Sequence, residues 1–128
     1  MKRVIMELGV PNKNGRTYPP EEMAKAIERY NDKVCYGEVG SAVNVDLGHA
    51  SHRFMNLEVF RNAEGCYLRG DLTLLDTSCG KMLREIMDTT EVAFRPAGIG
   101  ELRQTENGLE VINYELLSIN AMAAQEAA

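Results

Sequence analysis

The sequence contains no tryptophan, 3 cysteines, 4 prolines and 2 histidines among its 128 residues. Three widely spaced cysteines without a C-x-x-C pair give neither a disulfide framework nor a zinc knuckle, so we expect free thiols at Cys35, Cys66 and Cys79. No apolar run approaches the roughly 18 residues that a membrane span needs. The sequence therefore argues against a disulfide-rich protein and against a membrane-spanning helix.

Acidic residues outnumber basic ones. The chain has 14 Lys and Arg against 19 Asp and Glu, which gives a formal net charge of −5. Nucleic acids and anionic membranes attract basic surfaces, so we expect neither as a partner. With 45% hydrophobic residues, a chain of this length can bury a core without metals or disulfides. We predict a single globular domain over residues 1–128, made and used on the cytoplasmic side.

Short apolar segments between turn residues predict a protein built mainly from strands. Alternating apolar positions predict a strand over 3–8, a hairpin of 55–59 with 66–74, an interrupted extended segment over 92–102 and a strand over 109–120. Helical spacing predicts helices from Pro20 to about Asn31 and after Asp76–Ser78. Residues 34–51 read as a short strand and a long loop, and the tail from 121 is weakly specified. The fold class is α+β, a closed or half-closed, mostly antiparallel β-barrel with two flanking helices.

The two histidines, His49 and His52, lie in the glycine-rich loop, where a general base or a metal ligand can be placed. A metal site needs further ligands, and Asp46 and Cys35 are the nearby candidates. The alternative for His52 is a hydrogen-bonded structural histidine at the entrance to the next strand. We expect no metal and no cofactor.

Acyl transfer needs a nucleophile, and the sequence offers a limited set: Ser41, Ser51, Ser78, Cys79 and Ser118. Cys79 stands out because a helix N-terminus favours the thiolate form of a cysteine. An isolated cysteine on an amphipathic helix is nevertheless more typical of packing than of catalysis. The segment Gly98–Gly100 is not a phosphate loop, because no Lys-Ser or Lys-Thr follows it and it lies inside a strand pattern.

Several segments occur in an order that matches a known family. The specific ones are N-x-N-G-R-x-Y-P over 12–19 and L-D-T-x-x-G-K over 75–81, and the looser ones cover 37–40, 45–52 and 95–100. Together they span nearly the whole chain. They resemble the prohead (capsid maturation) proteases of tailed bacteriophages, whose fold is shared with the herpesvirus assemblins. The resemblance implies a small β-barrel flanked by helices, encoded in a phage head-assembly module.

The serine protease chemistry of that family depends on a His and a Ser. The resemblance places the His directly after the element Gly37–Gly40, where this chain has Ser41. It places the nucleophilic Ser at Ala93, which has no hydroxyl group. Loss of both proton-transfer groups leaves a serine hydrolase with only residual catalysis. The resemblance therefore implies a fold that has lost its activity.

Three hypotheses follow. The first is a bacteriophage virion structural protein, made in the host bacterial cytoplasm, that decorates the phage head by binding the major capsid protein as a homo-oligomer or multi-copy array. The second is a prohead maturation serine protease that cleaves scaffold and capsid proteins, either active with His49 or His52 as base, or inactivated by a Ser-to-Ala change at Ala93. In that protease the region around Arg95 helps to form the oxyanion site. The third is an unrelated α+β domain whose two histidines bind a metal. Under the first hypothesis, Arg95 and Arg103 are expected to be solvated on their strands rather than in interface ion pairs.

Overall fold

The computed structural model describes residues 2–31, 36–40, 45–106 and 108–127. Its elements in chain order are β1 (Lys2–Leu8), β2 (Arg16–Thr17), α1 (Pro20–Asn31), β3 (Tyr36–Gly37), the 3-10 helix η1 (Leu47–His49), β4 (His52–Arg61), β5 (Cys66–Leu74), α2 (Ser78–Thr89), β6 (Val92–Thr105), β7 (Gly108–Ala123) and α3 (Ala124–Ala127). The strands form a four-stranded sheet in the order β1-β5-β4-β3 and a three-stranded sheet in the order β2-β7-β6.

Antiparallel pairing dominates both sheets. The predicted hairpin is confirmed, because β4 pairs with β5 from His52↔Leu74 to Arg61↔Cys66, and β1 adds to the other side of β5. In the second sheet β6 and β7 form one long antiparallel ribbon, and the short β2 pairs with β7 in parallel. The α+β class and the mostly antiparallel sheet predicted from the sequence are therefore confirmed.

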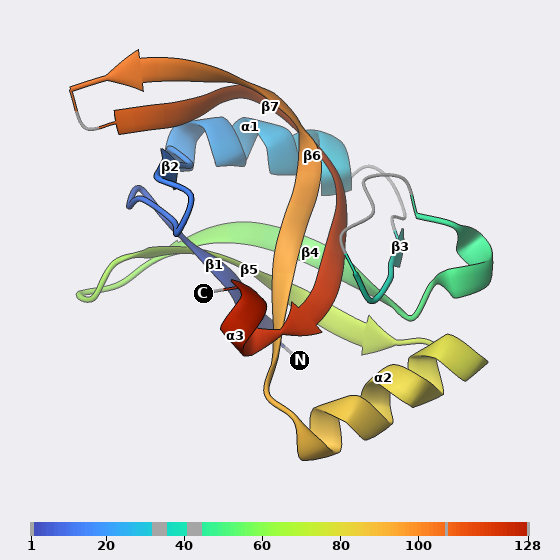
Figure 1. Ribbon diagram of the computed structural model, residues 1–128. Helices are drawn as coiled ribbons and strands as arrows, with labels where there is room; N and C mark the ends of the chain where they lie inside the picture. The colour runs from blue at the N-terminus through green and yellow to red at the C-terminus, as the bar shows by residue number, and fades with distance from the viewer. Residues whose placement is uncertain (1, 32–35, 41–44, 107, 128) are drawn as a thin grey trace.

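The two sheets curl toward each other into a half-closed barrel (Figure 1). On one side, the segment that follows β3 is joined to β7 by the bridge Val39↔Ala121 and by the Gly40 N–H, which donates to the Ala121 carbonyl at 2.9 Å. On the other side β1 runs beside β6, and Arg3 Nη2 donates to the Val92 carbonyl at 3.4 Å. Within the described residues β1 and β6 share no strand ladder. The barrel is thus closed along β3–β7 and open along β1–β6.

Both predicted helices form where the sequence places them. Helix α1 starts at Pro20, whose fixed φ suits a first helical position, and it buries Met23, Ala26, Ile27 and Tyr30. Helix α2 is capped by Thr77, whose hydroxyl accepts the Gly80 N–H at 3.1 Å. Within the described ranges, no helix is both long enough and apolar enough to cross a membrane.

Two expectations at the C-terminal end were wrong. The segment from Val92 is one uninterrupted strand, because extra residues in β7 take up the register shifts at Ala97/Gly98 and Ile99/Glu101, and an edge strand tolerates Pro96. Strand β7 continues to Ala123 and is followed by α3, so this part of the tail is ordered by pairing with β6. The expected loop before His52 also contains the helical turn η1.

The hydrophobic core lies between the two sheets, under α1. Its fully buried large side chains come from both sheets and both long helices: Phe54, Phe94, Met23, Leu68, Leu83 and Ile119. Of the three cysteines, Cys66 is buried and free, Cys79 is partly exposed and free, and Cys35 lies outside the described residues. The core therefore unites the two sheets into one packed unit.

Candidate functional site

His52 is fully buried where β3, β4 and β7 meet. Its Nε2 lies 2.7 Å from the Ile119 carbonyl, which can only accept, so Nε2 carries the proton and Nδ1 accepts the Ser51 hydroxyl at 2.7 Å. The rings of Phe54 and Phe94 pack edge-on against the imidazole. Burial lowers the pKa of His52 below its usual value of 6.5, despite the hydrogen bond to Ile119. His52 is therefore held in its neutral form.

In this arrangement His52 has a structural role. Ser51 is also fully buried, so the Ser51–His52 pair has no surface on which a substrate could lie. A Cβ atom at Gly37 would overlap the Ile119 carbonyl and the imidazole, which explains why glycine stands there. The geometry matches the alternative derived from the sequence, a hydrogen-bonded histidine at the start of a strand.

His49 lies on η1, and its side chain is 71% exposed. Its Nδ1 is 3.5 Å from Oδ2 of Asp46, and Oδ1 of the same carboxylate accepts the Gly48 N–H at 2.9 Å. The Cys79 sulfur lies 4.0 Å from the Gly48 carbonyl, so α2 begins beside this turn. Among the described residues no three His, Cys, Asp or Glu side chains gather in a way that could hold a metal, and Cys35 is not among them.

The other candidate nucleophiles are scattered. Ser118 is fully buried in β7, and Ser78 is exposed at the first position of α2. Cys79 follows Ser78 and is partly exposed. Ser41 lies outside the described residues. The structure thus brings only Ser51 into hydrogen-bond contact with a histidine, within the part of the chain it describes.

A groove of about 420 Å³ runs along the open side of the barrel. Ile5, Met6 and Glu7 line it from β1, Ala93, Phe94 and Arg95 line it from β6, and Val10, Pro11, Asn12, Lys13 and Ala124 complete its walls. We call this the β1–β6 groove. Its described lining contains no hydroxyl, thiol or imidazole side chain, and Ala93 contributes only a methyl group. Two strand edges face it, since β1 and β6 are the outer strands of their sheets.

The family-like segment over 12–19 contributes Asn12 and Lys13 to the lining of this groove. The Asn12 carboxamide oxygen accepts the N–H groups of Asn14 and Arg16 at 2.9 and 3.0 Å, and Gly15 has a φ of 73°. The Gly9 N–H donates to the Tyr18 carbonyl at 2.9 Å, which closes the base of the turn. Asparagine and glycine are needed at these positions because the turn depends on a side-chain acceptor and a left-handed residue.

A second cavity, of about 220 Å³, lies on the other side of Arg95. It is lined by Gly40, Arg95, Pro96, Ala97, Asn120 and Met122, so Arg95 borders both hollows. Asn120 is 1% exposed, and its carboxamide oxygen accepts the Glu38 N–H at 3.1 Å. The segment that leads to Ser41 and the segment that follows Ala93 therefore meet at one cavity. Arg95 is only partly exposed there, whereas Arg103 is exposed as expected and pairs with Glu110 of its own chain at 2.9 Å.

Buried polar groups concentrate at this junction of β3, β4 and β7. Sequence reasoning missed Asn120, and it also missed Glu38 and Arg53, which each bury a polar atom that has no hydrogen-bond partner among the described residues: Glu38 Oε2 and Arg53 Nε. Such atoms are uncommon in native proteins and mark places where a ligand or a rearrangement can satisfy them. The one available signal was an asparagine inside the apolar run at the end of β7.

No protein-family model matches the sequence, and no curated protein matches it either. Among solved structures, the chain is similar to the bacteriophage T4 capsid assembly protease, gp21, with a TM-score of 0.75 and 21% sequence identity. The match covers 95% of this chain and 79% of that one. The chain has a prohead-protease-like fold. The barrel and helices that the sequence resemblance implied are thereby confirmed, and at this level of identity the likeness concerns the fold alone.

Proposed function

We propose that this protein is a structural component of a phage head that binds an extended segment of the major capsid protein in the β1–β6 groove without cleaving it. The observation that carries the proposal is the composition of the groove. Ala93 lines it, and its described walls hold no serine, threonine or cysteine side chain that could attack a peptide bond. The groove has the shape of a binding site, and its described lining lacks the hydroxyl or thiol nucleophile of a serine or cysteine protease.

The positions of the two histidines support the same proposal. His52 uses both ring nitrogens inside the core, and neither His52 nor His49 lines the groove. A general base must come within about 3 Å of the proton that it removes, directly or through one water. With 2 histidines in the whole sequence, a His-dependent protease would have to take its base from one of these places.

An extended segment is the ligand that the groove suits best. Strand edges carry unpaired N–H and C=O groups, and a peptide that pairs with an edge satisfies them. The lining supplies apolar surface from Ile5, Met6 and Phe94, and charged groups from Glu7 and Arg95. Backbone pairing would give affinity in such a complex, and these side chains would give selectivity.

The test incubates the protein with unprocessed capsid protein, unprocessed scaffold protein and assembled heads of the phage that carries the gene. We expect stoichiometric co-sedimentation with heads and no cleavage by mass spectrometry. The groove variant Ala93→Phe should abolish co-sedimentation, whereas Ala63→Phe, an equal change at an exposed turn position, should leave it intact. Thermal unfolding of both variants checks that the fold survives.

Cleavage by the wild-type protein would overturn the proposal in favour of the maturation protease. Equal binding by the wild type and Ala93→Phe would show that the capsid protein binds outside the groove. The double variant Ala93→Ser with Ser41→His adds the two groups that the family resemblance places at these positions. Cleavage by that variant alone would agree with a protease fold that lost its catalytic groups.

A further inference from the structure

The β6–β7 ribbon continues well beyond the barrel and reaches over α1 (Figure 1). Strand β7 pairs with β6 along one edge and with the short β2 at Leu109 and Glu110 on the other, whereas β6 is an outer strand along its whole length. From Ile99 to Gln104 every residue of β6 is exposed. This stretch therefore presents an open strand edge that the described part of the chain does not cover.

The open edge carries apolar side chains as well as unpaired backbone groups. Ile99 is 64% exposed and Leu102 is 47% exposed. A long edge strand with exposed apolar residues is a template for pairing with another strand, and proteins that avoid such pairing place prolines, bulges or inward charges along it. The two register shifts between β6 and β7 end at Glu101, so the stretch from Glu101 to Thr105 pairs with β7 without irregularity.

We infer that this edge of β6 pairs in antiparallel fashion with the same edge of a second copy of the chain. A two-fold axis at Leu102 would set Leu102 opposite Leu102 of the second copy. The same register would set Glu101 opposite Arg103, and Ile99 opposite Thr105. The interface is isologous, since each copy supplies the same surface.

Charge complementarity favours a second copy as the occupant. Directly opposite residues in an antiparallel pair lie on one face and interact, and opposite charges there are favourable. The register gives two Glu101–Arg103 pairs, one on each side of the axis. Both side chains are already oriented within their own copy, because Glu101 accepts from Asn113 at 2.9 Å and Arg103 donates to Glu110 at 2.9 Å. Each keeps further hydrogen-bonding capacity for a partner.

Pairing over one short edge buries little surface, so the dimer is expected to be weak in dilute solution. It would form where copies are concentrated, and a covalent trap detects it at low occupancy. Opposite Cα atoms in an antiparallel pair are about 4.5–5.5 Å apart, which lies within the range that a disulfide spans. The register places residue 102 of each copy at that separation. Residues 99 of the two copies would be about 20 Å apart.

The test is therefore mild oxidation of Leu102→Cys, with Ile99→Cys as the matched control at a more exposed position of the same edge. Peptide mass spectrometry distinguishes a disulfide between introduced thiols from one that involves a native cysteine. We expect Leu102→Cys to form the symmetric cross-link at least tenfold faster than Ile99→Cys. Equal rates, or a cross-link in neither variant, would overturn the inference.

Charge reversal then tests the register in the Leu102→Cys background. Glu101→Arg alone puts arginine against Arg103 of the other copy, and Arg103→Glu alone puts glutamate against Glu101, so each protein alone should cross-link about tenfold more slowly. Mixing the two proteins restores opposite charges at both pairs and should restore the rate as a mixed dimer. Because the same two proteins are compared alone and mixed, damage within either copy cannot produce this result. Failure of the mixture to recover would overturn the register, whatever the outcome for the groove.

Discussion

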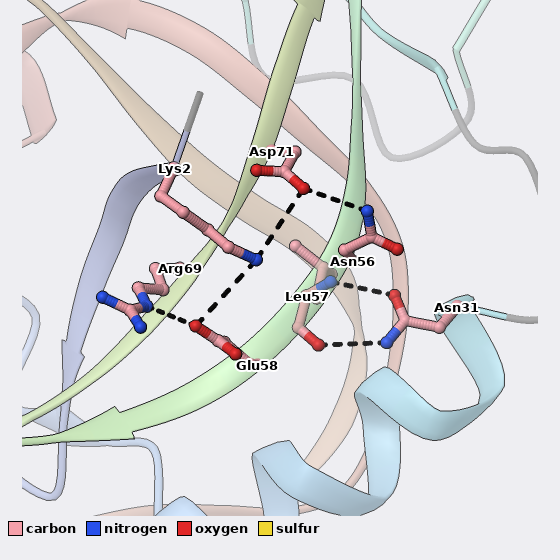
Figure 2. Close-up of polar contacts among 7 residues, drawn as sticks. All are labelled: Lys2, Asn31, Asn56, Leu57, Glu58, Arg69 and Asp71. Carbon is pink, nitrogen blue, oxygen red and sulfur yellow. Dashed lines mark hydrogen bonds and ion pairs between the residues drawn. The ribbon is translucent and has the colours of Figure 1, made fainter.

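Asn31, the last residue of α1, binds both backbone polar groups of Leu57 in β4 (Figure 2). Its Nδ2 donates to the Leu57 carbonyl at 3.0 Å, and its Oδ1 accepts the Leu57 N–H at 3.0 Å. Leu57 lies in the irregularity between Met55 and Glu58, where β4 loses its register with β5. The carboxamide therefore makes the two backbone hydrogen bonds that a neighbouring strand would otherwise make with Leu57. These bonds fix the end of α1 to the sheet.

Removing this side chain should destabilise the protein. Asn31→Ala leaves two part-buried backbone groups unpaired, and we expect the free energy of unfolding to fall by about 2–3 kcal/mol. Urea denaturation followed by circular dichroism measures the change. Asn14→Ala, at an exposed turn position, is the matched control and should cost less than about 0.5 kcal/mol. A similar loss for both variants would contradict a special role for Asn31.

The ion pairs beside Asn31 should matter far less. Glu58 contacts Arg69 and Lys2, and Lys2 also lies 3.7 Å from Asp71 (Figure 2). The side chains of Glu58 and Lys2 are 41% and 44% exposed, so solvent screens their attraction. Glu58→Gln should lower the free energy of unfolding by less than about 1 kcal/mol, and the difference should shrink in 1 M salt. A salt-independent loss as large as that of Asn31→Ala would show a buried, coupled network instead.

Much of the fold could be predicted because its signals are local. Alternating apolar residues identified the β4–β5 hairpin, and the sequence from Pro20 onward identified α1. The uninterrupted course of β6 could not be predicted from Pro96 and its neighbouring glycines. Their effect depends on β6 being an edge strand and on β7 supplying the extra residues at the two register shifts, and distant pairing sets both.

The site was predicted less completely for the same reason. Sequence reasoning proposed that His52 is either a base or a structural residue, and the choice depends on Ile119, which lies 67 positions away along the chain. The β1–β6 groove joins residues from the two ends of the chain, so its apolar lining has no local signal. Ala93 was singled out only through a family resemblance, which supplied a long-range alignment that composition and periodicity do not contain.

Gly37 should tolerate no side chain. A methyl group there would overlap the Ile119 carbonyl and the His52 ring, and both belong to the rigid junction of the two sheets. We expect Gly37→Ala to lower the free energy of unfolding by about 3 kcal/mol, in the range of an overpacked core. Gly48→Ala, whose Cβ would meet only the Asp46 side chain at 3.3 Å or more, is the control and should be nearly neutral. If thermal melting showed equal effects at both positions, the close approach at Gly37 would not limit stability.

The protonation of His52 should make the fold sensitive to acid. Burial lowers the pKa of His52 in the folded protein below 6.5, the value expected in the unfolded chain, so the unfolded state takes up the proton first. The contribution of His52 to stability is therefore complete above about pH 6.5. It declines as the pH falls from there toward the folded-state pKa, by about 1.4 kcal/mol for each unit of difference. Urea denaturation at a series of pH values measures this decline, and His52→Gln should remove it while His49→Gln, at an exposed position, should not. A decline of equal steepness in His52→Gln would assign the acid sensitivity to the carboxylates.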